Sequence, residues 1–383
     1  MPGGDWRVVM GGVMSDVLTE PWRKLFGPAK AGDESVTVQM RLLRRGGRAF
    51  LLLPTAGSLA AKSLSLYPAQ TRRARLAKSF LRAAFNFSLP VRLETVSLTI
   101  NRGDAFADYL RRTTRVTDKA MPAFALLAGN PRAAGSRCVL LLFDSAGAPA
   151  AVVKAGADAE AFRLIEREET FLKSAPPKTP GVPGVRSGYR SEHVSAFAMD
   201  FFPGVSPRPG NSPIVERLLG SWIDSGRKPA IGDLPLWQRL VAGVSALPEP
   251  IKRVGSATVH PTIYHGDFAP WNIKVRGEDW TLLDWERGEL AGLPLWDWLH
   301  FIVQPAILVE RRPTETVLGE IESFLQSPAL ARYAERSGIA GLERALAAAY
   351  FQHCVHVLRP SEGLEEFRAL GEAAARRWFC GTE

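Results

Sequence analysis

The 383-residue sequence predicts an α+β protein with strands concentrated in its first half and helices in its second. Three observations support this fold class. Short apolar runs typical of strands recur as far as residue 202. Apolar side chains then occur at helical spacing in residues 212–250 and 295–380. The length of the chain also exceeds what one hydrophobic core usually organises. We therefore expect two or three structural units.

The composition is that of a globular protein from a reducing compartment. Hydrophobic residues make up 46% of the chain and charged residues 23%, which argues against wholesale disorder. The three cysteines form no CxxC pair, which argues against a disulfide scaffold or a cysteine-built zinc site. No run approaches the roughly 18 apolar residues of a membrane-spanning helix, and the N-terminus lacks the basic-then-apolar order of a signal peptide. We expect a cytoplasmic protein.

The positive charge of the chain is concentrated at one end. Residues 1–120 contain 20 Lys and Arg against 9 Asp and Glu, whereas the remaining residues contain 28 against 30. Such asymmetry indicates either a surface that meets an anionic partner or an added domain with its own solubility needs. It also predicts a boundary near residue 120.

The first third is predicted to hold a loosely ordered lead-in, residues 1–34, and a basic α+β module, residues 35–120. Val36–Leu53 reads as a β-hairpin with Gly-Gly in its turn. A helix over residues 69–86 follows, and the module ends with a further strand and a short helix. Their predicted bounds are Val91–Ile100 and Asp104–Arg112.

The helix over residues 69–86 has an apolar face and many basic residues. The apolar face is predicted to comprise Leu76, Phe80, Leu81, Ala84 and Phe85. The basic residues, largely off that face, are Arg72, Arg73, Arg75, Lys78 and Arg82. Two interpretations stay open: a solvated face over a packed stripe, or contact with an anionic glycan or a membrane surface. Nucleic acid ranks last, because basic and aromatic residues do not interleave in the RNA-binding manner.

From residue 121 the pattern changes to short apolar strands followed by a helix. The strands are predicted at Phe124–Leu127, at Cys138–Phe143 and in a run that ends at Lys154, and the helix at Asp158–Lys173. The inward stripe of this helix would comprise Ala161, Ile165, Glu168 and Leu172. A carboxylate within an apolar stripe needs a cationic partner, because burying an unpaired charge is costly.

The segment from residue 263 to residue 301 carries the groups best suited to chemistry. A strand at Thr262–Tyr264 precedes a polar loop, and a hairpin of Ile273–Val275 and Thr281–Leu283 follows it. This geometry is expected to bring three oxygen-bearing side chains to one edge, namely those of Asp267, Asn272 and Asp284. Carboxylate and amide oxygens suit Mg²⁺, and a carboxylate not used for metal can accept a proton from a hydroxyl. The pattern is typical of phosphoryl transfer.

Three motifs in this segment resemble those of the aminoglycoside phosphotransferase and choline kinase-like family. His265–Asn272 resembles the catalytic loop HGDxxxxN, Leu283–Glu286 the metal-binding segment, and Pro294–Asp297 the P-x-x-D element that follows. The resemblance covers about residues 120–320. It implies a protein-kinase-like bilobal fold, with an N-lobe and hinge at 121–204 and a helical C-lobe at 205–383.

The resemblance also implies roles for the residues of the catalytic segment. Asp267 would be the catalytic base, and Asn272 and Asp284 would hold Mg²⁺. Asp297 would brace the loop without reacting. His265 is expected to be a structural histidine that hydrogen-bonds to backbone.

Residues of the N-lobe would bind the nucleotide, ATP or GTP. Lys154 would contact the α- and β-phosphates and Glu168 would pair with it, in competition with the neighbouring Glu166 and Glu169. Met199–Gly204 matches the hinge of the family. A glycine-containing loop would cover the nucleotide through Gly129 and Gly135, although it lacks the G-x-G-x-x-G pattern.

The implied activity is transfer of a γ-phosphate to a hydroxyl group of a small molecule. Ala269 stands where protein kinases usually carry Lys, which favours a small-molecule acceptor such as a sugar, a glycan intermediate, an amino alcohol or an aminoglycoside-like compound. The weak net charge beyond residue 120 slightly disfavours a polycationic aminoglycoside. The alternative is a pseudokinase-like nucleotide-binding scaffold whose basic module binds an anionic partner.

Overall fold

The structure is a computed structural model of the chain, which divides into two compact units. The first unit contains residues 1–173 and 183–202, and the second contains residues 174–182 and 203–383. The structure describes residues 21–27, 34–45, 47–67, 69–114, 121–129, 135, 137–207, 212–360 and 363–379. Most of the predicted lead-in, residues 1–34, lies outside the described residues.

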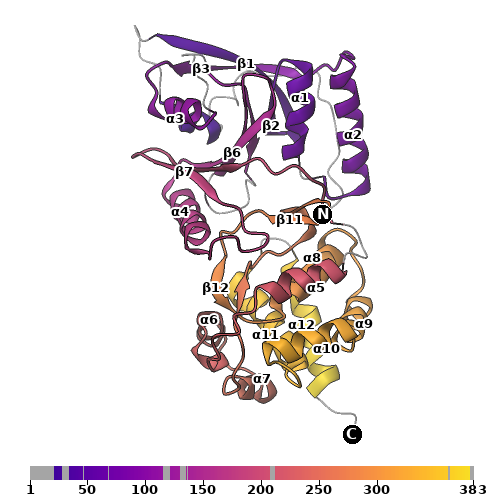
Figure 1. The fold of residues 1–383 in the computed structure, drawn as a ribbon. Helices are drawn as coiled ribbons and strands as arrows, with labels where there is room; N and C mark the ends of the chain where they lie inside the picture. Colours follow the sequence, from indigo (N-terminus) through magenta and orange to yellow (C-terminus); the bar gives the residue numbers. More distant parts are fainter. Residues whose placement is uncertain are drawn as a thin grey trace. The chain divides into compact units, whose positions relative to one another are not determined.

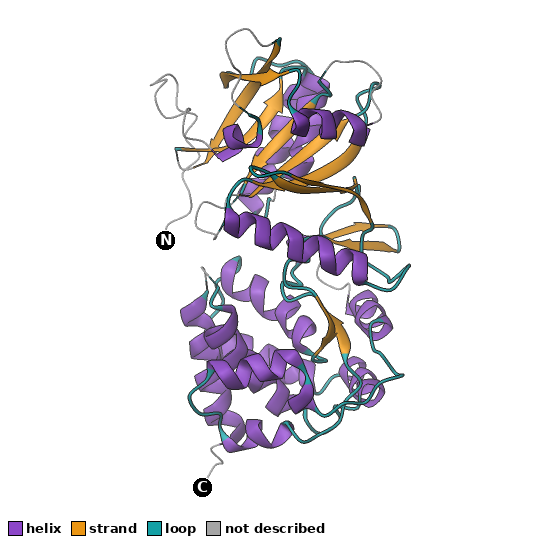
Figure 2. Ribbon diagram, turned by 90° about the vertical axis from the view of Figure 1, so that its left-hand side faces the viewer, coloured by secondary structure: helices purple, strands orange, loops and turns teal. Residues whose placement is uncertain are grey.

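The first unit is built on one antiparallel sheet of eight strands in the order β3-β1-β2-β4-β5-β6-β8-β7 (Figures 1 and 2). The strands are β1 (Ser35–Arg45), β2 (Arg48–Pro54), β3 (Glu94–Asn101), β4 (Phe124–Ala128), β5 (Arg137–Phe143), β6 (Pro149–Gly156), β7 (Val185–Arg190) and β8 (Ser195–Asp200). Leu51 and Leu52 of β2 pair with Leu127 and Leu126 of β4. The strands of the basic module therefore continue the sheet formed by the strands after residue 120.

Helices cover both faces of this sheet. On one face, α3 (Ala105–Thr114) contributes Phe106 and Leu110 to a core with strand residues such as Leu42 and Leu140. On the other face lie α1 (Gly57–Ser63) and α2 (Arg72–Asn86), side by side in Figure 1. The helix α4 (Ala159–Ser174) follows β6, as the sequence predicts.

The predicted apolar face of α2 is wrong for two of its residues. Ala84 and Phe85 are buried, but Leu76 is 72% exposed and Phe80 is 68% exposed. Successive helical residues turn by about 100°, so Phe80 and Phe85 point about 140° apart. A single packed layer cannot cover both directions, and in α2 it covers the Phe85 side.

The second unit is mainly helical, which confirms the predicted fold class. Its helices are α5 (Ser212–Ser221), α6 (Pro235–Gly243), α7 (Glu249–Val254), α8 (Trp296–Leu308), α9 (Thr314–Leu325), α10 (Pro328–Ser337), α11 (Glu343–His353) and α12 (Leu364–Phe379). Two strand pairs accompany them, β9 (Thr262–Tyr264) with β12 (Glu289–Gly292) and β10 (Ile273–Arg276) with β11 (Asp279–Leu282). Among the helices that the structure describes, none is long and apolar enough to cross a membrane.

A buried histidine makes the second unit sensitive to acid. His353 at the end of α11 is 1% exposed and its ring lies 4.7 Å from that of Trp296. Among the described residues, neither ring nitrogen has a hydrogen-bond partner. Burial lowers the pKa of His353 from 6.5 to about 3. The folded protein therefore holds this ring neutral where the unfolded chain protonates it.

We expect His353→Phe to reduce the loss of stability at acid pH. Below pH 6.5 the unfolded chain binds a proton that the folded chain excludes, so wild-type stability falls as the pH drops toward about 3. Each such group contributes up to about 1.4 kcal/mol per pH unit. Urea unfolding between neutral pH and about pH 4 measures the slope. The exposed His193→Phe is the control, and a His353→Phe slope equal to wild type would contradict the assignment.

Candidate functional site

The loop that follows β9, residues 265–272, is hydrogen-bonded through its backbone to one buried carboxylate. Asp297, in the first turn of α8, is 5% exposed. Its two oxygens accept hydrogen bonds from the backbone N–H groups of His265 and Gly266, at 2.7 and 3.0 Å. Burial raises the pKa of Asp297 to about 7, although these hydrogen bonds oppose the rise. The predicted bracing contact of Asp297 is thus present.

Gly266 is required where it stands. Its φ is +78°, and a Cβ atom there would lie 2.7 Å from Cβ of Arg287. A side chain would therefore meet both backbone strain and a close neighbour. The residue lets the loop turn tightly between the buried His265 and the partly exposed Asp267.

The ring of His265 joins the loop to the end of β11. The ring Nδ1 lies 3.2 Å from the backbone nitrogen of Asp267 and accepts its hydrogen. The ring Nε2 lies 3.0 Å from the carbonyl oxygen of Leu283, so this nitrogen carries the proton. Burial lowers the pKa of His265 to about 4. The prediction of a structural histidine bonded to backbone is confirmed.

The carboxylate of Asp267 is fixed on both oxygens. Its Oδ1 lies 3.1 Å from Nε2 of His300, and its Oδ2 accepts a 2.8 Å hydrogen bond from Nδ2 of Asn272. Its side chain is 27% exposed, so the carboxylate is still accessible. Burial alone would raise the pKa of Asp267, but His300 and, more weakly, Arg287 hold it well below its usual range. The group is an oriented anion.

Asn272 and Asp284 are linked through the hairpin that follows the loop. Ile273 pairs with Leu282, and the backbone nitrogen of Leu283 donates a 2.7 Å hydrogen bond to the carbonyl oxygen of Asn272. Asp284 is the next residue and has a φ of +72°. Such a backbone is uncommon outside glycine, and strain of this kind gathers at functional positions.

The donor set of Asn272 and Asp284 fits a hard cation. Because Nδ2 of Asn272 donates to Asp267, Oδ1 is the amide atom that can serve as a ligand. The carboxylate of Asp284 supplies a second oxygen. Within the described ranges, no group of three or more His, Cys, Asp or Glu residues is placed to hold a metal. Mg²⁺ in phosphoryl transfer is commonly bound by one or two protein ligands together with substrate phosphates.

In the first unit, Lys154 of β6 and Glu168 of α4 form the predicted ion pair. The Nζ atom of Lys154 lies 2.6 and 2.7 Å from the two carboxylate oxygens of Glu168. Both side chains are largely buried, with 13% and 3% exposed. The competing residues, Glu166 and Glu169, pair elsewhere. The contact is present, whereas its role toward a nucleotide stays a prediction.

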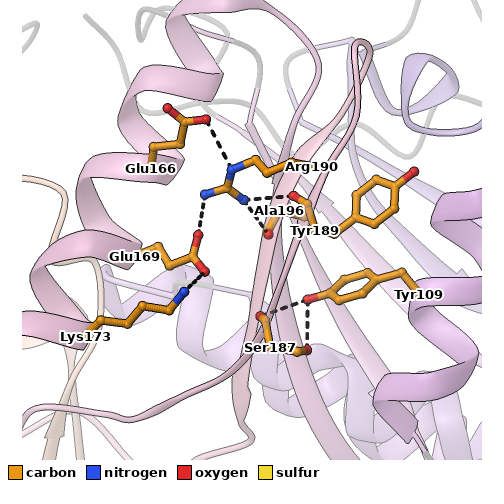
Figure 3. A network of polar contacts seen from close by, with 8 residues as sticks. All are labelled: Tyr109, Glu166, Glu169, Lys173, Ser187, Tyr189, Arg190 and Ala196. Carbon is orange, nitrogen blue, oxygen red and sulfur yellow. Dashed lines mark hydrogen bonds and ion pairs between the residues drawn. The ribbon is translucent and has the colours of Figure 1, made fainter.

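A second polar network ties α4 to β7 (Figure 3). Arg190 pairs with Glu166 and Glu169 of α4 and donates a 2.9 Å hydrogen bond to the carbonyl oxygen of Ala196 on β8. Glu169 also pairs with Lys173, at 2.7 Å. Glu168 and Glu169 are thus neighbours in sequence that are bound to different strands. Of these contacts, the sequence predicts the pair of Glu168 with Lys154 but not the pair of Glu169 with Arg190.

The structure gives the two loop glycines a packing role. A Cβ atom on Gly129 would lie 2.2 Å from the carbonyl oxygen of Arg137, and one on Gly135 would lie 2.7 Å from the backbone nitrogen of Ala161. Each glycine permits a close approach of two backbones. Met199, the predicted hinge residue, is buried in β8 shortly before the chain passes into the second unit. The nucleotide contacts of all three stay predictions.

Sequence reasoning missed His300 and Tyr350. His300 is 2% exposed, and its Nδ1 lies 2.9 Å from the hydroxyl of Tyr350. With that hydroxyl as donor, Nε2 of His300 carries the proton that it shares with Asp267. A signal was present, because Asp297 and His300 are three residues apart in a helical segment and such residues share a face.

Comparisons with known proteins find similarity only among solved structures. No protein-family model matches the sequence, and no curated protein matches it. Aminoglycoside phosphotransferase APH(4)-Ia is 13% identical over 71% of this chain and 97% of its own, with a TM-score of 0.45. A candidate fructosamine-3-kinase from Haemophilus somnus 129PT is 11% identical over 70% and 96%, with a TM-score of 0.39. APH(3'')-Id from Streptomyces rimosus ATCC10970 is 16% identical over 56% and 88%, with a TM-score of 0.35. The activity of this chain has to be inferred from its own residues.

We expect the ring of His265 to be neutral, with its proton on Nε2, down to about pH 4. Burial opposes the charged form, and Nδ1 is occupied as an acceptor. Nitrogen chemical shifts of labelled histidine report both the tautomer and the titration midpoint, and loss of one signal in His265→Asn assigns it. A midpoint near the ordinary value of 6.5, or a proton on Nδ1, would show that the ring does not make these contacts.

Proposed function

We propose that this chain is a Mg²⁺-dependent kinase that transfers the γ-phosphate of ATP or GTP to a hydroxyl group of a small molecule. The observation that carries the proposal is the Asp267 carboxylate. It is anionic, held on one oxygen by His300 and on the other by Asn272, and still partly exposed. Such a group can orient a hydroxyl by accepting its hydrogen bond.

The low pKa of Asp267 fits a late proton transfer. A weakly basic carboxylate does not strip an alcohol of its proton at the start. In a loose transition state the O–H bond of the acceptor breaks as its oxygen bonds to phosphorus, and that oxygen becomes acidic as the bond forms. Asp267 accepts the proton at this stage, while the bond from phosphorus to the β,γ-bridging oxygen breaks. Orientation of the acceptor is thus the main task of Asp267 in this proposal.

Asn272 and Asp284 would hold Mg²⁺ through one amide and one carboxylate oxygen. When bound, the ion neutralises phosphate charge. Lys154 would contact the α- and β-phosphates. The buried Glu168 fixes the Lys154 ammonium group, whose Nζ lies 2.6 Å from Oε1 of Glu168. These roles rest on the resemblance of the sequence motifs and on the contacts made within each unit.

The acceptor is proposed to be a sugar, a glycan intermediate, an amino alcohol or an aminoglycoside-like compound. Ala269, at the position where protein kinases carry Lys, is buried and offers no charge toward an acceptor. Incubation of the protein with labelled ATP and representatives of each class tests the proposal. Label transfer to any class supports it. Nucleotide binding without transfer to any of them would favour the scaffold interpretation.

Asp267→Ala is expected to lower turnover at least about a hundredfold, because the oriented proton acceptor is lost. Nucleotide affinity should change little, since Asp267 faces the acceptor in this proposal. Steady-state kinetics and nucleotide titration measure the two quantities. The exposed Asp279→Ala, on the same hairpin, is the matched control. Near-wild-type turnover of a folded Asp267→Ala protein would remove Asp267 from the mechanism.

Asp284→Asn is expected to abolish the Mg²⁺ dependence of nucleotide binding and, with it, the activity. Asn keeps the shape of Asp and tolerates the positive φ at this position, so the substitution removes the negative charge with little change of shape. Nucleotide titration with and without Mg²⁺ measures the effect. Glu278→Gln, at the exposed hairpin turn, controls for a general loss of negative charge. An unchanged Mg²⁺ dependence in Asp284→Asn would refute the ligand assignment.

A further inference from the structure

Exposed apolar side chains are concentrated at one place in the first unit. Among the described residues, seven large hydrophobic side chains are exposed, and four of them lie between residues 76 and 89. They are Leu76 at 72%, Phe80 at 68%, Phe87 at 76% and Leu89 at 53% exposed. Single exposed apolar residues are ordinary, but a contiguous group marks an interaction surface.

Three of these side chains share one face of α2 and its C-cap. Leu76, Phe80 and Phe87 are separated by four and seven residues, which places them on the same side of a helix. The opposite side of α2 packs against the sheet and α1 through Ala74 and Phe85. The outward stripe therefore adds nothing to the core that the inward stripe already forms.

The same helix is strongly cationic. Arg72, Arg73, Arg75 and Arg82 are exposed, and none of them has an ion-pair partner among the residues that the structure describes. The surrounding sequence contains no acidic residues that could balance this positive charge. Between Glu34 and Glu94 the chain contains 11 Lys and Arg and no Asp or Glu, although the whole chain has 39 acidic residues.

Leu and Phe side chains flanked by arginines fit the interface of an anionic lipid bilayer. An amphipathic helix of this kind lies in the plane of the headgroups, with its apolar side chains at the acyl boundary and its cations on anionic lipids. An anionic glycan or a nucleic acid would satisfy the arginines but leave Leu76 and Phe80 in water. A symmetric second copy would bring the same cationic face against itself.

We propose that the outward face of α2, with Phe87 and Leu89, is a peripheral membrane-binding surface for anionic lipid. Leu76, Phe80 and Phe87 enter the interface, and Arg72 and Arg73, which lie within about 100° of these side chains around the helix, contact lipid phosphates. Arg75 and Arg82 lie on the flank of α2 and add electrostatic attraction to the anionic surface. This proposal stands on the first unit alone and does not depend on the proposed phosphotransfer.

Vesicle flotation of the full chain tests the proposal. We expect binding to vesicles of equal parts phosphatidylcholine and phosphatidylglycerol, and none to phosphatidylcholine alone. Leu76→Ser with Phe80→Ser should weaken binding at least about tenfold. Replacing the four arginines by Gln should weaken it at least about a hundredfold, and high salt should reproduce much of that loss. All of these side chains are exposed, so thermal unfolding should be unchanged.

Matched controls come from the second unit. Val241→Ser with Leu290→Ser removes exposed apolar side chains, and Arg217→Gln with Arg344→Gln removes exposed arginines. Both control variants should bind like wild type.

Three outcomes would overturn the proposal. The first is that the wild-type protein binds neither kind of vesicle. If it then self-associates, and Leu76→Ser with Phe80→Ser abolishes that self-association, the face binds a second copy of the chain and not lipid. The second is binding that survives both sets of α2 substitutions. The third is binding lost with the arginines but unchanged by Leu76→Ser with Phe80→Ser, which would indicate a purely ionic surface for a glycan or nucleic acid.

Discussion

The candidate catalytic loop depends on one buried carboxylate. Asp297 offers its two oxygens to consecutive backbone N–H groups, those of His265 and Gly266, and so offsets part of the cost of its own burial. One turn later on the same helix, His300 reaches Asp267. A single helix therefore fixes both the backbone of the loop and the direction of its exposed carboxylate. Movement of α8 would disturb both together.

Some of the polar contacts in the two units could be predicted from the sequence. The helical stripe around Glu168 predicted a buried carboxylate that needs a cationic partner, the family resemblance named Lys154 as that partner, and the structure pairs the two. The helical spacing of Asp297 and His300 places these two residues on one face, but it does not identify the partners of His300. Those partners, Asp267 and Tyr350, lie 33 and 50 residues away from it in sequence. No local periodicity reports contacts across such separations.

The basic module shows a different limit of sequence reasoning. Apolar residues occur on more than one side of α2, so periodicity alone did not say which of them would be covered. The pairing of β2 with β4 joins residues 51–52 to residues 126–127, and strand pairing across that distance leaves no pattern in the sequence. The shift in charge near residue 120 is real, yet strands on either side of it share one sheet.

The position of α4 is fixed by two buried carboxylates that point in different directions. Glu168 is bound to Lys154 on β6, and Glu169 is bound to Arg190 on β7. Consecutive helical residues diverge by about 100°, so rotation of α4 about its axis would withdraw both carboxylates from their cations. Breaking one buried pair typically costs about 3–5 kcal/mol, because the remaining charge stays buried without compensation. The second network therefore opposes the rotation of α4 that would withdraw Glu168 from Lys154.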